Sequence, residues 1–167
     1  CVQNGKAWRW QIPEDLVDVV SINALEFAAS VINIWMADDG SISDLAPLSC
    51  VLSSTDSTSA ACWLHKSSFT DSHLFEQTTA RKLARIMLSA DSYLYSQWVA
   101  GSDNGIADAL SCFFHLDDSS LTDYIYHNYS VFMQLVPVSK EISLWMTFLL
   151  RHSKSAVELT CSQAKTP

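Results

Sequence analysis

The sequence predicts an α/β fold, because two kinds of hydrophobic periodicity alternate along the chain. Runs that alternate bulky and polar residues indicate strands at 7–11, 48–54 and 93–99. Runs with apolar residues three and four positions apart indicate helices at 23–37, 57–66, 73–90 and 106–113. The resulting order is strand, helix, strand, helix, helix, strand, helix, which favours a layered α/β architecture.

Local signals set the boundaries of these elements. Pro13 closes the first strand, Asn23 opens the first helix, and the sequence Asp38-Asp39-Gly40 stops it. The second strand is expected to bury three alternate residues, Leu48, Cys50 and Leu52. The helix at 73–90 has the clearest apolar side. Residues 67–72 form a polar loop, and a turn at 101–105 precedes the helix at 106–113.

The C-terminal part of the chain has a weaker pattern. One more helix is expected at 121–129, Pro137 breaks the chain, and a short isolated helix is expected at 141–150. Residues 152–167 are mostly polar. With 167 residues in total, the sequence predicts one domain at 1–128 and a C-terminal tail at 129–167 that carries one short helix.

Composition excludes several classes of protein. Hydrophobic residues make up 49 % of the chain, which argues against disorder, and the net charge of −8 gives a polyanion no overall attraction. The longest uncharged apolar stretch, 27–37, is shorter than the roughly 20 residues of a membrane helix, so no membrane association is expected. Five scattered cysteines without a C-x-x-C pair favour a reducing, intracellular location in the cytoplasm or the nucleus.

Three acidic residues have positions suited to chemistry. Glu26 lies in the first turns of the first helix, Asp56 follows the end of an apolar strand, and Asp108 lies among apolar neighbours in a helix. The carboxyl ends of strands are where α/β sheets gather ligands. Carboxylates brought together there repel one another unless a cation lies between them, and oxygen ligands suit Mg²⁺.

Each of these residues also has a structural interpretation. Glu26 would complete a capping box with Asn23, and Asp56 would cap the helix that begins at Ser57. Asp108 would favour the dipole of its own helix. The three residues point to a site only when they are taken together.

Three segments carry a family resemblance. INALEF (22–27), STDSTSAACWLHKSSF (54–69) and WVAGSDNGIADALS (98–111) resemble the ribonuclease H domain that follows reverse transcriptase in retrotransposons. The likeness covers roughly residues 7–120. It implies a ribonuclease H-like mixed sheet flanked by helices, from which the first two strands are missing, because only six residues precede the strand at 7–11.

The resemblance also implies a reaction. The family places four carboxylates around two Mg²⁺ (or Mn²⁺) ions and hydrolyses the RNA strand of RNA–DNA hybrids. Glu26, Asp56 and Asp108 match the second, third and fourth carboxylates and would be catalytic metal ligands. The first carboxylate, an aspartate, has no counterpart here, so the chain alone is not expected to cleave RNA.

Partners and substrate contacts follow from the same match. The partners would be an RNA–DNA hybrid and the upstream reverse transcriptase segment of the same polyprotein. Asn23 and Asn104 are the matched candidates for substrate binding. Arg81 and Arg85, spaced four residues apart on the long helix, would contact phosphates, or would simply form a solvated helix face.

Two other functions compete with the nuclease. A catalytically inactive retroelement remnant would act at most as a nucleic-acid-binding or structural module, which the missing aspartate and the acidic charge favour. An unrelated α/β interaction domain would scatter the three carboxylates over its surface.

Overall fold

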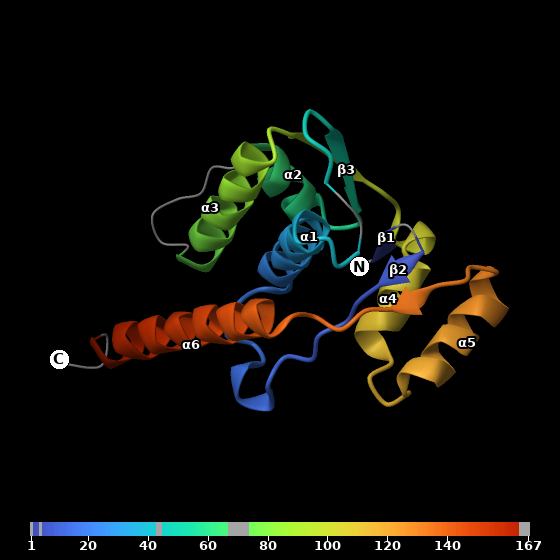
Figure 1. Cartoon of the computed structure of the whole chain (residues 1–167). Helices are drawn as coiled ribbons and strands as arrows, with labels where there is room; N and C mark the ends of the chain where they lie inside the picture. The colour runs from blue at the N-terminus through green and yellow to red at the C-terminus, as the bar shows by residue number, and fades with distance from the viewer. Residues whose placement is uncertain (1, 4, 43–44, 67–73, 164–167) are drawn as a thin grey trace.

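The computed structural model describes residues 2–3, 5–42, 45–66 and 74–163. Within these residues the elements follow one another as Figure 1 shows: β1 (Val2–Gln3), β2 (Lys6–Ala7), η1 (Glu14–Leu16), α1 (Ile22–Asp38), β3 (Cys50–Thr55), α2 (Thr58–Lys66), α3 (Leu74–Ser89), β4 (Tyr93–Trp98), η2 (Gly101–Asp103), α4 (Gly105–Cys112), α5 (Asp118–Tyr129), β5 (Gln134–Leu135) and α6 (Lys140–Gln163). None of the helices in this part of the chain combines the length and the hydropathy that a membrane span requires.

The described strands form two small sheets. In one, β1 pairs antiparallel with β2, and β2 pairs parallel with β5. In the other, β3 and β4 are parallel, in a register that runs from Cys50 opposite Tyr93 to Thr55 opposite Trp98. The mixed α/β class is therefore confirmed. The strands are divided between two sheets, however, where the sequence predicted one.

Helix α1 is the centre of the fold. Its N-cap is Ser21, whose Oγ accepts a hydrogen bond from the backbone N–H of Ala24 at 3.2 Å, so the expected start at Asn23 was one residue late. Ten residues of α1 are buried, because α2, α3 and β3 pack around it. The helix ends at Asp38, as the sequence predicted.

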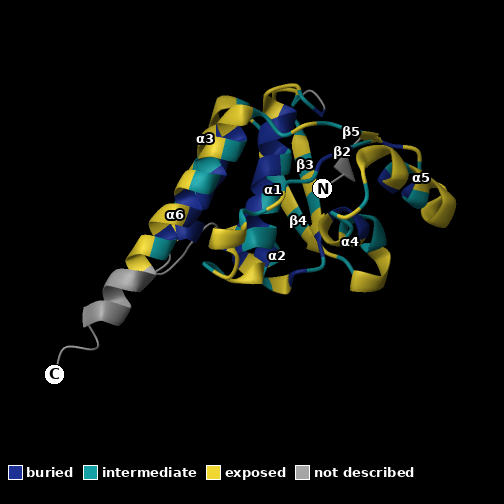
Figure 2. Ribbon diagram, turned by 90° about the horizontal axis from the view of Figure 1, so that it is seen from below, coloured by how far each residue is buried: buried dark blue, intermediate teal, exposed yellow. Residues whose placement is uncertain are grey.

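The parallel pair β3–β4 is covered on one face. Helix α2 packs on both strands, so Thr55 of β3 is buried and Val51 is half-buried. The opposite face includes Leu52 at 58 % exposure, and Figure 2 shows exposed residues in yellow on these strands. The expected burial of Leu48, Cys50 and Leu52 was therefore wrong, because the helices cover the other side of the strand.

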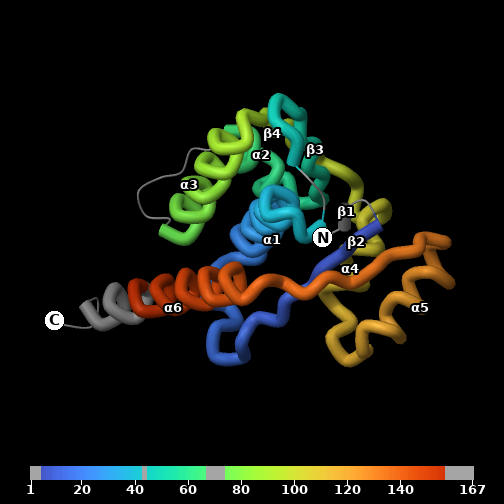
Figure 3. Tube along the Cα trace, in the orientation of Figure 1, coloured from blue at the N-terminus to red at the C-terminus, as the bar shows by residue number. Residues whose placement is uncertain are grey.

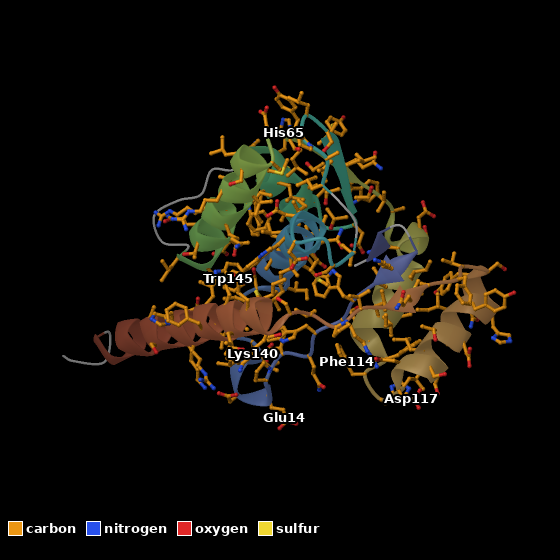
Figure 4. All side chains as sticks on the ribbon, viewed as in Figure 1. Glu14, His65, Phe114, Asp117, Lys140 and Trp145 are labelled. Carbon is orange, nitrogen blue, oxygen red and sulfur yellow. The ribbon has the colours of Figure 1, made fainter. Side chains whose placement is uncertain are left out.

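The buried apolar residues form two clusters. The main cluster joins residues of α1, α2, α3 and α6, and the smaller one joins Ala7, α4, α5 and Met133. Trp145 of α6 points toward α1 in Figure 4, where its ring meets that of Trp35 edge-on at 5.6 Å. The N-terminal segment reaches the smaller cluster through Arg9, which donates hydrogen bonds to the carbonyls of Phe113 and Leu116.

Two expected elements differ in length. The strand predicted at 7–11 is wrong beyond Ala7, because its neighbour β5 supplies only two residues to pair with β2. The helix expected at 141–150 is part of the longer α6, which packs on α3 and on η1. In Figure 3 the chain after β2 passes beneath α6 to reach η1, and Lys154 donates to the Asp15 carbonyl there. The loop expected at 67–72 lies outside the described residues.

Candidate functional site

A cavity of about 760 Å³ runs along β3 between α1 and α4. Its lining includes every residue of β3, one face of α1 from Glu26 to Ile34, and six residues of the segment 103–111. Four carboxylates line it, those of Glu26, Asp56, Asp103 and Asp108. No lysine, arginine or histidine of the described residues takes part in the lining, so the cavity has a strongly negative wall.

Asp56 lies at the carboxyl end of β3 and is held from two sides. Its carboxylate Oδ1 accepts a hydrogen bond from Asn104 Nδ2 at 3.0 Å, and its backbone carbonyl accepts one from Trp98 Nε1 at 2.8 Å. Its other carboxylate oxygen, Oδ2, lies 3.6 Å from the place that a Cβ at Gly101 would occupy. The segment from Trp98 to Asn104 therefore lies against Asp56.

Glu26 and Asp108 line the cavity from two different helices. Glu26 projects from the second turn of α1 and is half-buried. Asp108 is exposed in the first turn of α4, and its backbone N–H donates to the Asn104 carbonyl at 3.1 Å. A carboxylate in the first turn also favours the helix dipole, so the structural interpretation of Asp108 holds beside the functional one.

The capping interpretations of Glu26 and Asp56 were wrong. Ser57 caps α2, because its Oγ accepts from the backbone N–H of Ala60 at 3.1 Å. Ser21 caps α1, which leaves the box proposed between Asn23 and Glu26 without its cap. Neither carboxylate is therefore required to start a helix.

The side chains that line the cavity are of the type that binds a hard cation, but they are not arranged closely enough to hold one. Carboxylate oxygens are the ligands that Mg²⁺ and Mn²⁺ take in proteins. Among the described residues, however, no three histidine, cysteine, aspartate or glutamate side chains lie close enough together to hold one ion. The three predicted residues share a cavity without forming a coordination cluster.

The predicted substrate contacts lie in different places. Asn104 lines the cavity, whereas Asn23 is exposed outside it and its Oδ1 accepts from Ser57 Oγ at 3.4 Å. Arg81 and Arg85 are exposed on α3 and line neither described cavity. Sequence reasoning missed Asp103, although it stands in the GSDNG turn of the third matched segment.

A second cavity of about 460 Å³ adjoins the first. The two share Glu26 and Ala29 of α1 and Ala107 and Ser111 of α4. Aromatic and aliphatic side chains dominate the second, which extends to the segment from Trp8 to Ile12. Together the cavities form a trough that separates α1 from α4, and so separates the main cluster from the smaller one.

Comparison with known proteins identifies no relative: no family model, no curated protein and no solved structure matches the chain.

Proposed function

We propose that this chain carries part of a divalent-cation site of the ribonuclease H type, which serves the hydrolysis of RNA in RNA–DNA hybrids once a further carboxylate completes it. The observation that carries the proposal is the shared cavity. Glu26, Asp56 and Asp108 lie far apart in the sequence and on three different elements, and all three line it.

Each of the three carboxylates lies on or beside a different element. Asp56 is fixed at the carboxyl end of a parallel strand, where α/β sheets collect ligands. Glu26 and Asp108 line the same cavity from two helices. A divalent ion supplies an activated water and stabilises the leaving oxygen in phosphodiester hydrolysis. The role of the chain is to hold the ion and to present the backbone of the hybrid to it.

The resemblance implies that the site is incomplete. It assigns a fourth carboxylate to a strand ahead of the one predicted at 7–11. The described acidic residues do not converge on one point. The expectation that this chain alone binds cations weakly and does not cleave RNA follows from that separation.

Thermal unfolding in the presence of Mn²⁺ tests the proposal. An ion that binds only the folded state at 100 times its dissociation constant stabilises the protein by about 2.7 kcal/mol. We expect Mn²⁺ to raise the melting temperature, and the substitutions Asp56→Asn and Asp108→Asn to abolish the rise. The matched control is Asp123→Asn, an exposed aspartate of α5 that does not line the cavity.

The substrate class is tested by fluorescence anisotropy in the same buffers. We expect the chain with Mn²⁺ to bind an RNA–DNA hybrid more tightly than a DNA duplex of the same sequence. The absence of any Mn²⁺ effect on the wild-type chain would overturn the cation site. Equal binding of hybrid and duplex would overturn the assignment of the substrate.

The alternative is an inactive remnant that serves as a structural module, and one observation favours it. No three of the described acidic side chains are close enough for a shared ion. On this alternative Mn²⁺ leaves the melting temperature unchanged, and Asp56→Asn stabilises the chain slightly because it removes one negative charge from the wall of the cavity.

A further inference from the structure

Strand β3 uses only one of its two edges for pairing within the described residues. At the two ends of the pair, the carbonyls of Ser49 and Thr55 accept hydrogen bonds from the backbone N–H groups of Tyr93 and Val99, at 2.9 and 3.0 Å. A parallel ladder uses alternate residues of each strand, so the odd-numbered residues of β3 face β4.

The even-numbered residues of β3 direct their backbone groups to the other edge. These residues are Cys50, Leu52 and Ser54. No strand of the described part of the chain pairs with that edge, and no backbone group there bonds to these three residues. The free edge of β3 therefore offers three N–H donors and three carbonyl acceptors in a regular row.

The free edge has none of the features that usually prevent an exposed strand from pairing. Natural proteins protect such edges with lysine, proline, bulges or very short strands. β3 pairs with β4 over six consecutive residues without a bulge, and its sequence, CVLSST, has no proline and no charged residue. The outer strands of the other sheet, β1 and β5, have two residues each. β3 is thus the described strand best suited to accept a further strand.

The free edge lies along the cavity between two helices. Every residue of β3 lines this cavity, and α1 and α4 contribute to its walls. Figures 2 and 3 show β4, β3 and β2 in this order across the molecule, so the free edge faces the side on which the other sheet lies. A second copy of this chain would bring its own α1 and α4 to the same place, whereas a single extended peptide has no flanking helices to accommodate.

The cavity is acidic toward one end only. The hydrogen bond from Ser57 Oγ to Asn23 Oδ1, at 3.4 Å, places the start of α1 at the carboxyl end of β3, and Asn104 donates to Asp56 there. The lining toward this end contains four carboxylates, and no described basic side chain lines the cavity: Glu26, Asp56, Asp103 and Asp108. The lining at the other end is uncharged: Ile34, Leu45, Ala46, Ser49 and Cys50. A positive charge on the occupant is therefore favoured at the carboxyl end of β3 alone.

We propose that the free edge of β3 binds an extended peptide segment of a partner protein as an added strand, with a lysine or arginine at the end beside Asp56. Main-chain hydrogen bonds to the free edge supply affinity, and alternate apolar side chains of the peptide pack toward Ala29 and Ile34 of α1. This inference goes beyond the proposed function and does not depend on a bound ion.

Amide hydrogen exchange of the whole chain, followed by NMR in a buffer with chelator, tests the proposal. The probe is a blocked peptide of about eight residues that alternates valine and threonine and has a lysine at each end. In the free chain we expect the amides of Cys50, Leu52 and Ser54 to exchange quickly and those of Val51 and Ser53 to be protected by β4. Millimolar probe should slow exchange at the first three by about tenfold or more and leave the other two unchanged.

Variants of the probe and of the chain test the two parts of the recognition. N-methylation of one alternate set of probe residues should abolish binding and that of the other set should not, because an added strand bonds to β3 through every second residue. The substitution Asp56→Asn should weaken binding of the lysine probe several-fold and leave binding of a probe with glutamine at both ends unchanged. The matched control is Asp123→Asn, which alters an exposed aspartate outside the cavity.

Four outcomes would overturn the proposal. The amides of Cys50, Leu52 and Ser54 could remain unprotected with the probe, or both N-methylated sets could behave alike, and either result excludes an added strand. Protection that grows with the concentration of the chain without probe would make a second copy the occupant. Equal affinity for probes with lysine and with glutamate at both ends would remove the basic residue from the recognition. Because the buffer contains a chelator, none of these results depends on the proposed cation site.

Discussion

Replacement of Leu150 by alanine tests whether α6 belongs to the core. Leu150 is fully buried in the main cluster, whereas Leu144 on the same helix is 59 % exposed. Truncation of a buried leucine removes its apolar contacts and leaves a cavity, at a cost of about 2–5 kcal/mol. We expect Leu150→Ala to lower the free energy of unfolding by about 3 kcal/mol or more, and Leu144→Ala to change it by less than about 0.5 kcal/mol.

Urea unfolding followed by circular dichroism measures both variants. The comparison uses the midpoints at a common slope, because a change of slope alone would report a change in the surface exposed on unfolding. Should Leu150→Ala fail to fold, Leu150→Met preserves the volume and is expected to cost less than about 1.5 kcal/mol. Equal midpoints for Leu150→Ala and Leu144→Ala would refute the packing of α6 against the main cluster.

Three more predictions concern caps and charges. Ser57→Ala should destabilise the chain by about 1 kcal/mol in the same urea assay, because it removes the cap of α2, whereas Thr58→Ala, which alters an exposed neighbour, should not. The backbone hydrogen bond from Ser120 lowers the pKa of Asp117 below 3.8. The ionised Asp117 carboxylate therefore stabilises α5 fully above pH 3.8, and this stabilisation is lost as the pH falls through the lowered pKa. Circular dichroism of Asp117→Ala should therefore differ from that of the wild-type chain at pH 7 and converge with it in acid. Burial lowers the pKa of Lys82 below 10.5, so the unfolded chain binds this proton more tightly than the folded chain does. The stability of the wild-type chain relative to Lys82→Gln should therefore rise with pH between the lowered pKa and 10.5.

Periodicity predicted the helices well because the apolar side of each helix packs into one of the two clusters. Helices α1 to α5 all lie within a few residues of their expected ranges. The buried face of β3 was not predictable in this way, because Ser53 and Thr55 face inward while Leu52 faces outward. The position of the covering helices decides this, and apolar residues alone do not reveal it.

The length of α6 escaped prediction for a different reason. The residues from His152 onward suggested a polar tail, but polar residues on one side do not stop a helix in the absence of glycine or proline. Ser153 and Ser155 bond back to carbonyls four residues earlier, so their hydroxyls are satisfied inside the helix.

The candidate site could be predicted in part. The end of β3 and the first turns of two helices were expected to bring Glu26, Asp56 and Asp108 to one place, and all three line one cavity. Asn104 was predicted as a substrate contact, and its long-range hydrogen bond to Asp56 had no local signal in the sequence. Contacts across the sequence depend on tertiary placement, which single-residue preferences do not contain.

The separation of the carboxylates follows from the way the core is divided. Glu26 belongs to a helix of the main cluster, whereas Asp108 belongs to a helix of the smaller one, and the trough lies between them. Along that trough β3 has an open edge, since its pairing with β4 uses alternate residues and no described strand pairs with the other side. The hydrogen bond from Asn104 to Asp56 crosses from α4 to β3 beside this gap. A ligand that is to draw the carboxylates of Glu26 and Asp108 together therefore has to contact both α1 and α4, and not one helix alone.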